Sequence, residues 1–209
     1  MRGFEEIREF VEREIVPRYD GFDAGHGRDH VQTVISQALS LAQYYPEVDK
    51  SLLLVAAAYH DLGLVNGREH HHTDSARIVR EDQRLRQWFS DEEINTIADA
   101  AEDHRASSGH EPRTLYGRIV AEADRIIDSE TIVRRALQYG MRHEPGLDRE
   151  GQYRRLMEHM REKYDYGGYL KLWIPHGDNA RRLEAFRHLL ADPEAFRRLF
   201  DKIYNSLIH

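Results

Sequence analysis

The stretch from Leu52 to Leu64, LLLVAAAYHDLGL, decides the fold. Its first eight residues carry no charge, and a helix that is apolar on every side is typical of the centre of a protein. His60 and Asp61 follow directly, so an imidazole and a carboxylate stand at the end of a helix that should be buried. Buried polar side chains need partners, which makes this position the first candidate for a functional site.

Helical spacing of apolar residues continues along nearly the whole chain, and the sequence predicts an all-α protein. Ser90 and Glu93 have the spacing of a capping box, and Pro193 occupies the first position of the last helix. Residues 164–173, YDYGGYLKLW, are expected to be a loop or a short extended piece. The expected helices cover residues 4–15 (ended by Pro17), 31–42, 51–62, 90–101 and 112–128, followed by two at the C-terminus. Another is expected to run through residues 76–79, with Thr73 or Asp74 as its cap.

Composition indicates an ordinary globular protein. The 209 residues are 40% hydrophobic and 32% charged, which suffices for one domain with a proper core. A net charge of −7 argues against bulk binding to nucleic acid or to anionic membranes. The sequence has no cysteine, no apolar run near the ~20 residues that span a bilayer, and no signature of a secretory signal. We therefore expect a cytoplasmic protein that does not enter membranes.

Two further polar residues stand where the helical pattern predicts burial. His30 lies one turn before Val34, on the apolar face of its helix. Asp124 faces inward in GRIVAEADRIID, where the predicted outward face carries Arg118, Glu122, Arg125 and Ser129. Each position alone has an ordinary explanation: His30 as a cap or surface residue, Asp124 paired with an arginine or backbone amides, and His60–Asp61 as helix-end polarity.

A metal ion would be a partner for His30, His60, Asp61 and Asp124 at once. Two imidazoles and two carboxylates leave open positions on an octahedral ion, which suits Mn²⁺, Fe²⁺, Co²⁺, Ni²⁺ or Mg²⁺ better than structural zinc. The sequence therefore predicts one divalent metal ion bound by residues from three helices.

The ordered set resembles the H…HD…D signature of the HD-domain metal-dependent phosphohydrolases. GHGRDHVQTV (25–34) resembles the opening HxxxH motif of that family, and AAAYHDLG (56–63) its HD-(I/L)-G motif. HHTDSA (71–76) and AAEDHR (100–105) resemble its later histidine motifs. The resemblance covers about residues 20–130, and residues 172–204 resemble the tails of bacterial HD hydrolases with poorly defined substrates.

The resemblance implies His30, His60, Asp61 and Asp124 as metal ligands. It also implies His71 and His104 as phosphate contacts, or as ligands of a second metal. His104 continues the inward face of its helix, whereas His71 is only one of three consecutive histidines in a loop that could simply be solvated. Asp61, His104 and His71 are the expected catalytic residues, and the expected substrate contacts are His26, Arg28, Asp29 and His72.

Two positions depart from the family pattern. Thr33 stands where relatives often have arginine, and Leu64 stands where some nucleotidase members have a catalytic glutamate. The mechanism and deoxynucleotide substrate of that subgroup should therefore not be transferred.

The expected protein is a compact HD-domain bundle with additional C-terminal helices. It would be a single domain over residues 1–209, with a metal-binding core (20–130) and a helical extension (131–209) packed on it. The expected activity is hydrolysis of a phosphate ester or anhydride of a small phosphorylated substrate such as a nucleotide, in a monomer or a homo-oligomer. A metal-containing regulatory module without turnover and an HD-type di-iron oxygenase remain alternatives.

Overall fold

The computed structural model describes residues 3–23, 25–107, 110–175 and 177–208. All regular structure within these ranges is helical, with ten α-helices and several 3₁₀ or π turns. The predicted all-α fold with extra C-terminal helices is therefore confirmed. No helix among the described residues is long and apolar enough to cross a membrane.

The chain divides into two compact units. Unit 1 comprises Met1–Arg125 together with Trp173–His176, and unit 2 comprises Ile126–Leu172 and Gly177–His209. The chain thus leaves unit 1 after the sixth helix and returns to it for a short segment before the last two helices. Whether residues 131–209 pack on the metal-binding core stays a prediction, and each unit is described by itself.

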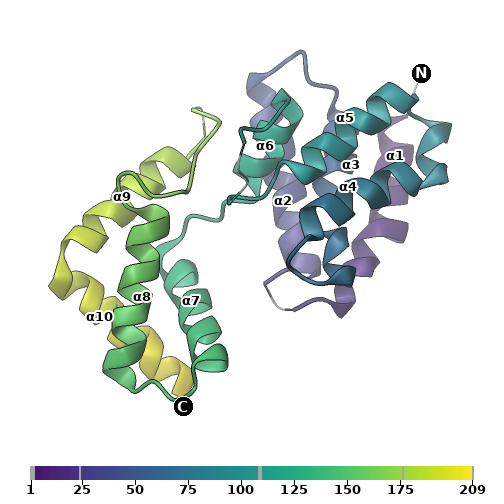
Figure 1. The fold of residues 1–209 in the computed structure, drawn as a ribbon. Coiled ribbons are helices and arrows are strands. Elements are labelled where there is room, and N and C mark those ends of the chain that lie inside the picture. Colours follow the sequence, from purple (N-terminus) through teal and green to yellow (C-terminus); the bar gives the residue numbers. More distant parts are fainter. Residues whose placement is uncertain (1–2, 24, 108–109, 176, 209) are drawn as a thin grey trace. The chain divides into compact units, whose positions relative to one another are not determined.

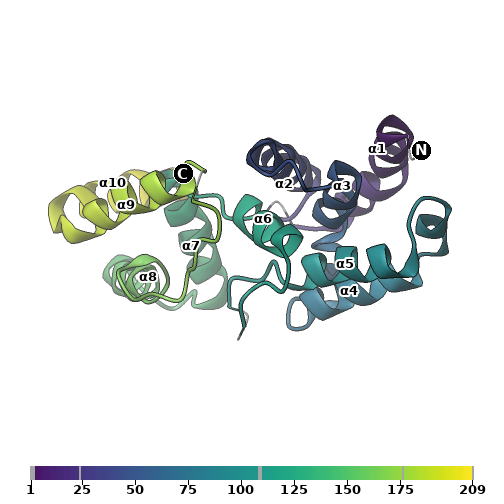
Figure 2. The same ribbon diagram turned by 90° about the horizontal axis from the view of Figure 1, so that it is seen from above.

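Unit 1 is built around one apolar helix, α3. Every residue from Ser51 to Tyr59 is buried, and α3 contacts α1, α2, α5 and α6, which surround it in Figures 1 and 2. The α-helices of unit 1 are α1 (Phe4–Phe10), α2 (Arg28–Leu41), α3 (Lys50–Tyr59), α4 (His71–Glu81), α5 (Asp91–Glu102) and α6 (Leu115–Ala123). A π turn (Val11–Ile15) and 3₁₀ turns (Val16–Gly21, Ala42–Tyr44, Leu62–Asn66 and Gln83–Gln87) complete it.

Local sequence signals set several helix ends. The Asp49 side chain caps α3 by accepting hydrogen bonds from the amides of Ser51 and Leu52. Ser90 and Glu93 form the predicted capping box of α5. Helical turns continue past Pro17 to Gly21 as a 3₁₀ segment, because proline is compatible with the first turn of a helical segment.

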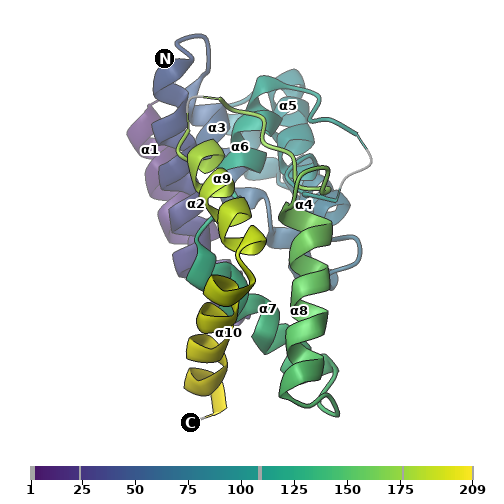
Figure 3. The ribbon, with the colours of Figure 1, turned by 90° about the vertical axis from the view of Figure 1, so that its left-hand side faces the viewer.

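Unit 2 is a group of four helices, all visible in Figure 3. The helix α7 contacts α8 and α10, and α9 contacts both α8 and α10. Aromatic residues form its centre: Phe186, Phe196 and Phe200 are fully buried. The helices are α7 (Ser129–His143), α8 (Arg149–Tyr164), α9 (Asn179–Ala191) and α10 (Pro193–Ile208).

Candidate metal centre

The helix α3 ends where the sequence places its His–Asp pair. His60 and Asp61 form the turn after Tyr59, and Asp61 departs from helical geometry with φ −109° and ψ 3°. His60 Nδ1 lies 2.7 Å from the carbonyl oxygen of Ala57, a group that an uninterrupted helix would pair with the Asp61 amide. Both residues are buried, so the turn delivers an imidazole and a carboxylate to the interior of unit 1.

Three side chains from three helices meet in a first triad, which consists of His30, His60 and Asp124. The Nε2 atoms of His30 and His60 lie 3.3 Å apart. Asp124 Oδ1 lies 3.2 Å from His30 Nε2 and 3.8 Å from His60 Nε2. His30 comes from the first turn of α2, and Asp124 caps the C-terminal end of α6. Three of the four predicted ligands of the first metal therefore lie close together.

A second triad consists of Asp61, His71 and His104. His71 begins α4 and His104 follows the end of α5. Their Nε2 atoms lie 3.2 Å apart, and Asp61 Oδ1 lies 3.6 Å from His71 Nε2 and 3.4 Å from His104 Nε2. Within each triad the ligand atoms all lie within 4.8 Å of one another, so each triad could hold a metal ion.

Asp61 joins the two triads because its two carboxylate oxygens face different histidines. Oδ2 lies 3.5 Å from His30 Nε2 and 3.3 Å from His60 Nε2, whereas Oδ1 faces His71 and His104. A carboxylate in this position can bind one ion through each oxygen. The arrangement fits two adjacent divalent ions as well as one.

Three of the four histidines have the same orienting contact. Nδ1 of His60, His71 and His104 lies 2.7, 2.8 and 2.6 Å from the carbonyl oxygen three residues earlier in the chain. A carbonyl oxygen only accepts, so Nδ1 carries the proton, and in the neutral imidazole the lone pair lies on Nε2. Each Nε2 faces its triad, which is the geometry of a metal ligand oriented by its surroundings.

The charged and polar groups of the cluster shift one another's pKa values. Burial disfavours the charged carboxylates, but the nearby histidines outweigh it and hold the pKa values of Asp61 and Asp124 below the usual range. Burial lowers the pKa of His30, yet hydrogen bonds to Asp124 and Asp61 raise it to about 9. Burial and the charge of His104 lower the pKa of His71 to about 4. Two ionised carboxylates, with imidazoles that can give up a proton to an incoming ion, are a donor set suited to a divalent transition metal.

His26, predicted to contact substrate, lies beside the first triad. Its ring centroid is 5.8 Å from that of His30, and its Nδ1 lies 2.8 Å from Asp23 Oδ1. The imidazole is half-buried, so one side remains accessible. The structure therefore places His26 where it could meet a group that is bound at the cluster.

The other predicted substrate contacts differ in their surroundings. Arg28 is exposed and forms a two-pronged ion pair with Asp20, with donor–acceptor distances of 2.9 and 2.6 Å. Asp29 is exposed in the first turn of α2. His72 is half-buried, 3.3 Å from an Nη atom of Arg105. Within the described residues, no hydrogen bond or ion pair joins Arg28 or Asp29 to either triad.

Two arginines near the cluster were not singled out from the sequence. The Arg68 guanidinium donates to His26 Nε2 at 2.9 Å, and the Arg68 carbonyl oxygen accepts from His71. Arg105, directly after His104, donates to the carbonyl oxygen of Glu69 at 2.7 Å. Both arginines lie outside the periodic helical pattern, and only their closeness in sequence to the histidine motifs could have identified them.

The prediction that Glu122 and Arg125 face solvent was wrong. Glu122 is 0% exposed and Arg125 is 6% exposed. Glu122 Oε2 accepts hydrogen bonds from the backbone N–H groups of Trp173 and Ile174, at 2.7 and 3.3 Å. Arg125 donates a hydrogen bond to the carbonyl oxygen of His104 at 3.3 Å. The short return segment of unit 1 covers this side of α6, which helix periodicity alone could not reveal.

Comparison with protein-family models matches residues 27–127 to the family described as HD domain. No curated protein and no solved structure matches the chain. The matched range contains every residue of the two triads, but it begins after His26.

Proposed function

Residues 27–127 of this chain are an HD domain, and from this premise we propose that the protein is a metal-dependent phosphohydrolase. Its substrate would be a phosphate ester or anhydride, in a nucleotide or another small phosphorylated metabolite. The observation that carries the proposal is the pair of His/Asp triads that share the carboxylate of Asp61. A purely structural metal site needs only one closed set of ligands.

A divalent ion held by these residues would lower the pKa of a water molecule and polarise a phosphoryl oxygen. The chain's own contribution is to fix ligands before the ion arrives: His60, His71 and His104 through their Nδ1 contacts, and Asp61 through its buried turn. The carboxylate oxygens of Asp61 and Asp124 can also orient a water molecule by accepting its hydrogen bonds. Preorganised ligands avoid a reorganisation cost during the reaction.

Positively charged and hydrogen-bonding groups near the triads support an anionic substrate. Arg68 and His26 contact each other beside the first triad, and Arg105 and His72 lie beside the second. The Arg68 guanidinium lies 4.0 Å from the Asp23 carboxylate, and because this ion pair is exposed and weak, Arg68 could still turn to phosphate oxygens. Local attraction of this kind can operate in a protein whose net charge is −7.

The decisive experiment combines elemental analysis with phosphate release. The wild type, Asp61→Asn and the remote control Asp201→Asn would be purified without chelator and incubated with nucleoside mono-, di- and triphosphates, cyclic nucleotides and sugar phosphates. We expect near-stoichiometric transition metal and turnover of one substrate group in the wild type and in the control, and loss of both in Asp61→Asn.

Other outcomes would support the alternatives. Bound iron with oxygen consumption and no phosphate release would support a di-iron oxygenase, which uses the same kinds of ligand. Bound metal without any turnover would support a regulatory module. If no metal binds, even after refilling with Mn²⁺, Fe²⁺ or Co²⁺, the proposal is wrong.

A further inference from the structure

Tyr19 belongs to a segment that precedes the HD match and yet reaches the candidate metal centre. It lies in the 3₁₀ turn Val16–Gly21 and is fully buried. Its ring packs edge-on against Phe22, with centroids 5.4 Å apart, and lies 6.4 Å from the ring of His60. The family match begins at residue 27, so no role for this tyrosine can be transferred from it.

The Tyr19 hydroxyl bonds to both sides of the turn that carries the His–Asp pair. It donates to the carbonyl oxygen of Ala58 at 2.8 Å and accepts from the amide of Asp61 at 3.3 Å. In an uninterrupted α-helix, the Ala58 carbonyl would accept from Leu62, and the Asp61 amide would donate to Ala57. The hydroxyl therefore satisfies two backbone groups that the end of α3 leaves without their usual helical partners.

His60 completes this exchange of partners. Its Nδ1 donates to the carbonyl oxygen of Ala57 at 2.7 Å. In a continued helix, the Asp61 amide would donate to this carbonyl instead. One imidazole and one phenol together stabilise the break in the helix. The break is what turns the Asp61 carboxylate towards both triads at once, because a continued helix would give Asp61 a different backbone conformation.

We propose that Tyr19 is a positioning residue of the metal centre, whose hydroxyl holds the His60–Asp61 turn so that Asp61 reaches both triads. The segment Val16–Gly21 is thereby part of the functional site, although it precedes the HD match. This inference needs the metal ion but not the hydrolysis, so metal binding tests it whatever the substrate.

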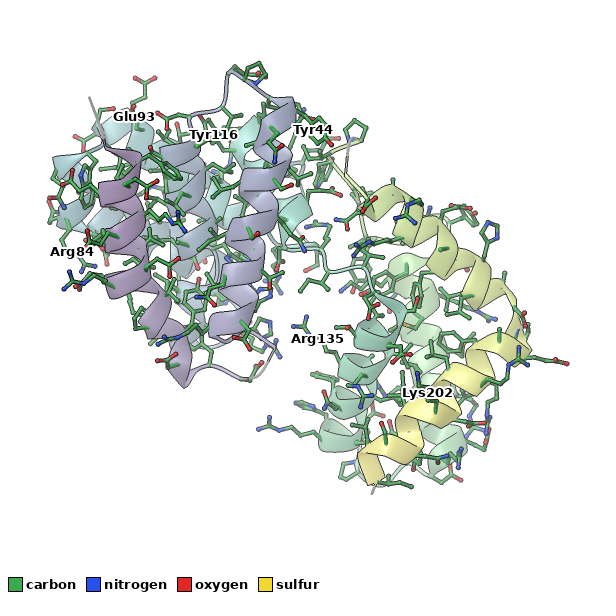
Figure 4. All side chains as sticks on the ribbon, turned by 180° about the vertical axis from the view of Figure 1, so that it is seen from behind. Tyr44, Arg84, Glu93, Tyr116, Arg135 and Lys202 are labelled. Carbon is green, nitrogen blue, oxygen red and sulfur yellow. The ribbon has the colours of Figure 1, made fainter. Side chains whose placement is uncertain are left out.

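The test compares Tyr19→Phe with Tyr59→Phe. Tyr59 is also fully buried on α3, and its hydroxyl donates to Asp82 Oδ2 at 2.7 Å. Asp82 is held in turn by Arg84, labelled in Figure 4. Each variant loses one phenolic hydroxyl with no change in ring packing, but only Tyr19 bonds to the turn before Asp61. Circular dichroism and thermal unfolding would establish that both variants fold.

Co²⁺ titration of the metal-free proteins, followed by visible absorption, provides the readout. We expect Tyr19→Phe to raise the dissociation constant about 10- to 100-fold, the usual effect of removing a group that orients a ligand, and to change the shape of the cobalt spectrum. Tyr59→Phe should keep the wild-type spectrum and an affinity within about twofold, since its hydroxyl bonds to Asp82 and not to the turn that carries the ligands.

A folded Tyr19→Phe protein with wild-type affinity and spectrum would overturn the proposal. An equal loss in both variants would also overturn it, because the cause would then be general destabilisation. If Tyr19→Phe does not fold, amide hydrogen exchange of the wild type decides instead. The Asp61 amide should be among the slowest to exchange, and rapid exchange there would contradict a hydrogen bond to Tyr19.

Discussion

A Cβ atom at Gly63 would stand 2.0 Å from the carbonyl oxygen of His71. The turn that follows Asp61 and the start of α4 therefore touch backbone to backbone. His71 belongs to the second triad and Asp61 to both, so this contact sets the distance between ligands on two separate segments. The glycine of the HD-(I/L)-G sequence is explained by the space at this contact, because only a residue without a side chain fits.

Gly63→Ala should destabilise unit 1 and disturb the second triad. The nearest atoms, His71 O and Ser75 N, are backbone atoms that cannot move without shifting α4. Insertion of a methyl group into a packed site costs about 1–3 kcal/mol, and we expect the upper end. Urea denaturation measures the loss, and elemental analysis should show less bound metal. Gly21→Ala is the control, because no atom lies within 4 Å of its added Cβ; equal losses in both variants would contradict this explanation.

Ser75→Ala tests the same contact without steric conflict. Ser75 is buried, and its Oγ accepts a hydrogen bond from the amide of Gly63 at 2.9 Å. Loss of the acceptor leaves a buried N–H unpaired, at a cost of about 1–3 kcal/mol. The exposed hydroxyl of Thr73, which donates to the His70 carbonyl, provides the comparison: Thr73→Ala should cost less than about 0.5 kcal/mol. Unfolding free energies that reverse this order would show that Ser75 does not anchor the turn.

Metal binding should release a proton from His30. With a pKa of about 9 in the metal-free protein, His30 is protonated at pH 7, and an ion that binds Nε2 must displace the proton. The affinity should therefore rise about tenfold per pH unit from pH 7 towards pH 9 and then level off. His71, with a pKa of about 4, is already neutral at pH 7 and releases none.

Calorimetric titration with Mn²⁺ at pH 7, in two buffers with different ionisation enthalpies, measures this release. The first ion should liberate about one proton from His30. His30→Gln should bind more weakly and without that contribution. Binding heats that are the same in both buffers would contradict the assignment of the proton.

Much of the fold and the ligand set could be predicted from the sequence because their signals are local. The uncharged run before His60 predicted the central helix, and Ser90 with Glu93 predicted the start of α5. The ordered histidine and aspartate motifs named all six residues of the two triads, since their types and order carry the information. Their roles as metal ligands, or as phosphate contacts for His71 and His104, stay predictions.

The rest depended on contacts between distant segments. Tyr19 lies 42 positions before Asp61 in the chain, and nothing in the spacing of residues 16–21 relates its hydroxyl to that amide. Glu122 was assigned to the solvent face because periodicity reports only one helix at a time. Residues 173–175 contact α6 only in the folded protein. There they supply two amide donors to the Glu122 carboxylate, which stabilise it in the interior.

The Glu122 contact supplies the last prediction, because its two amide partners belong to the return segment. A charged acceptor strengthens a hydrogen bond to about 1.5–3 kcal/mol, against about 0.5–1.5 for a neutral one. Glu122→Gln should therefore lower the unfolding free energy by about 1 kcal/mol, and Glu122→Ala by about 3 kcal/mol or more because buried amides lose their acceptor. In a Trp88→Phe background, Trp173 is the single tryptophan, and its emission should shift to longer wavelength in Glu122→Ala as the segment detaches. An unchanged emission maximum in that variant would show that the segment is held by other contacts.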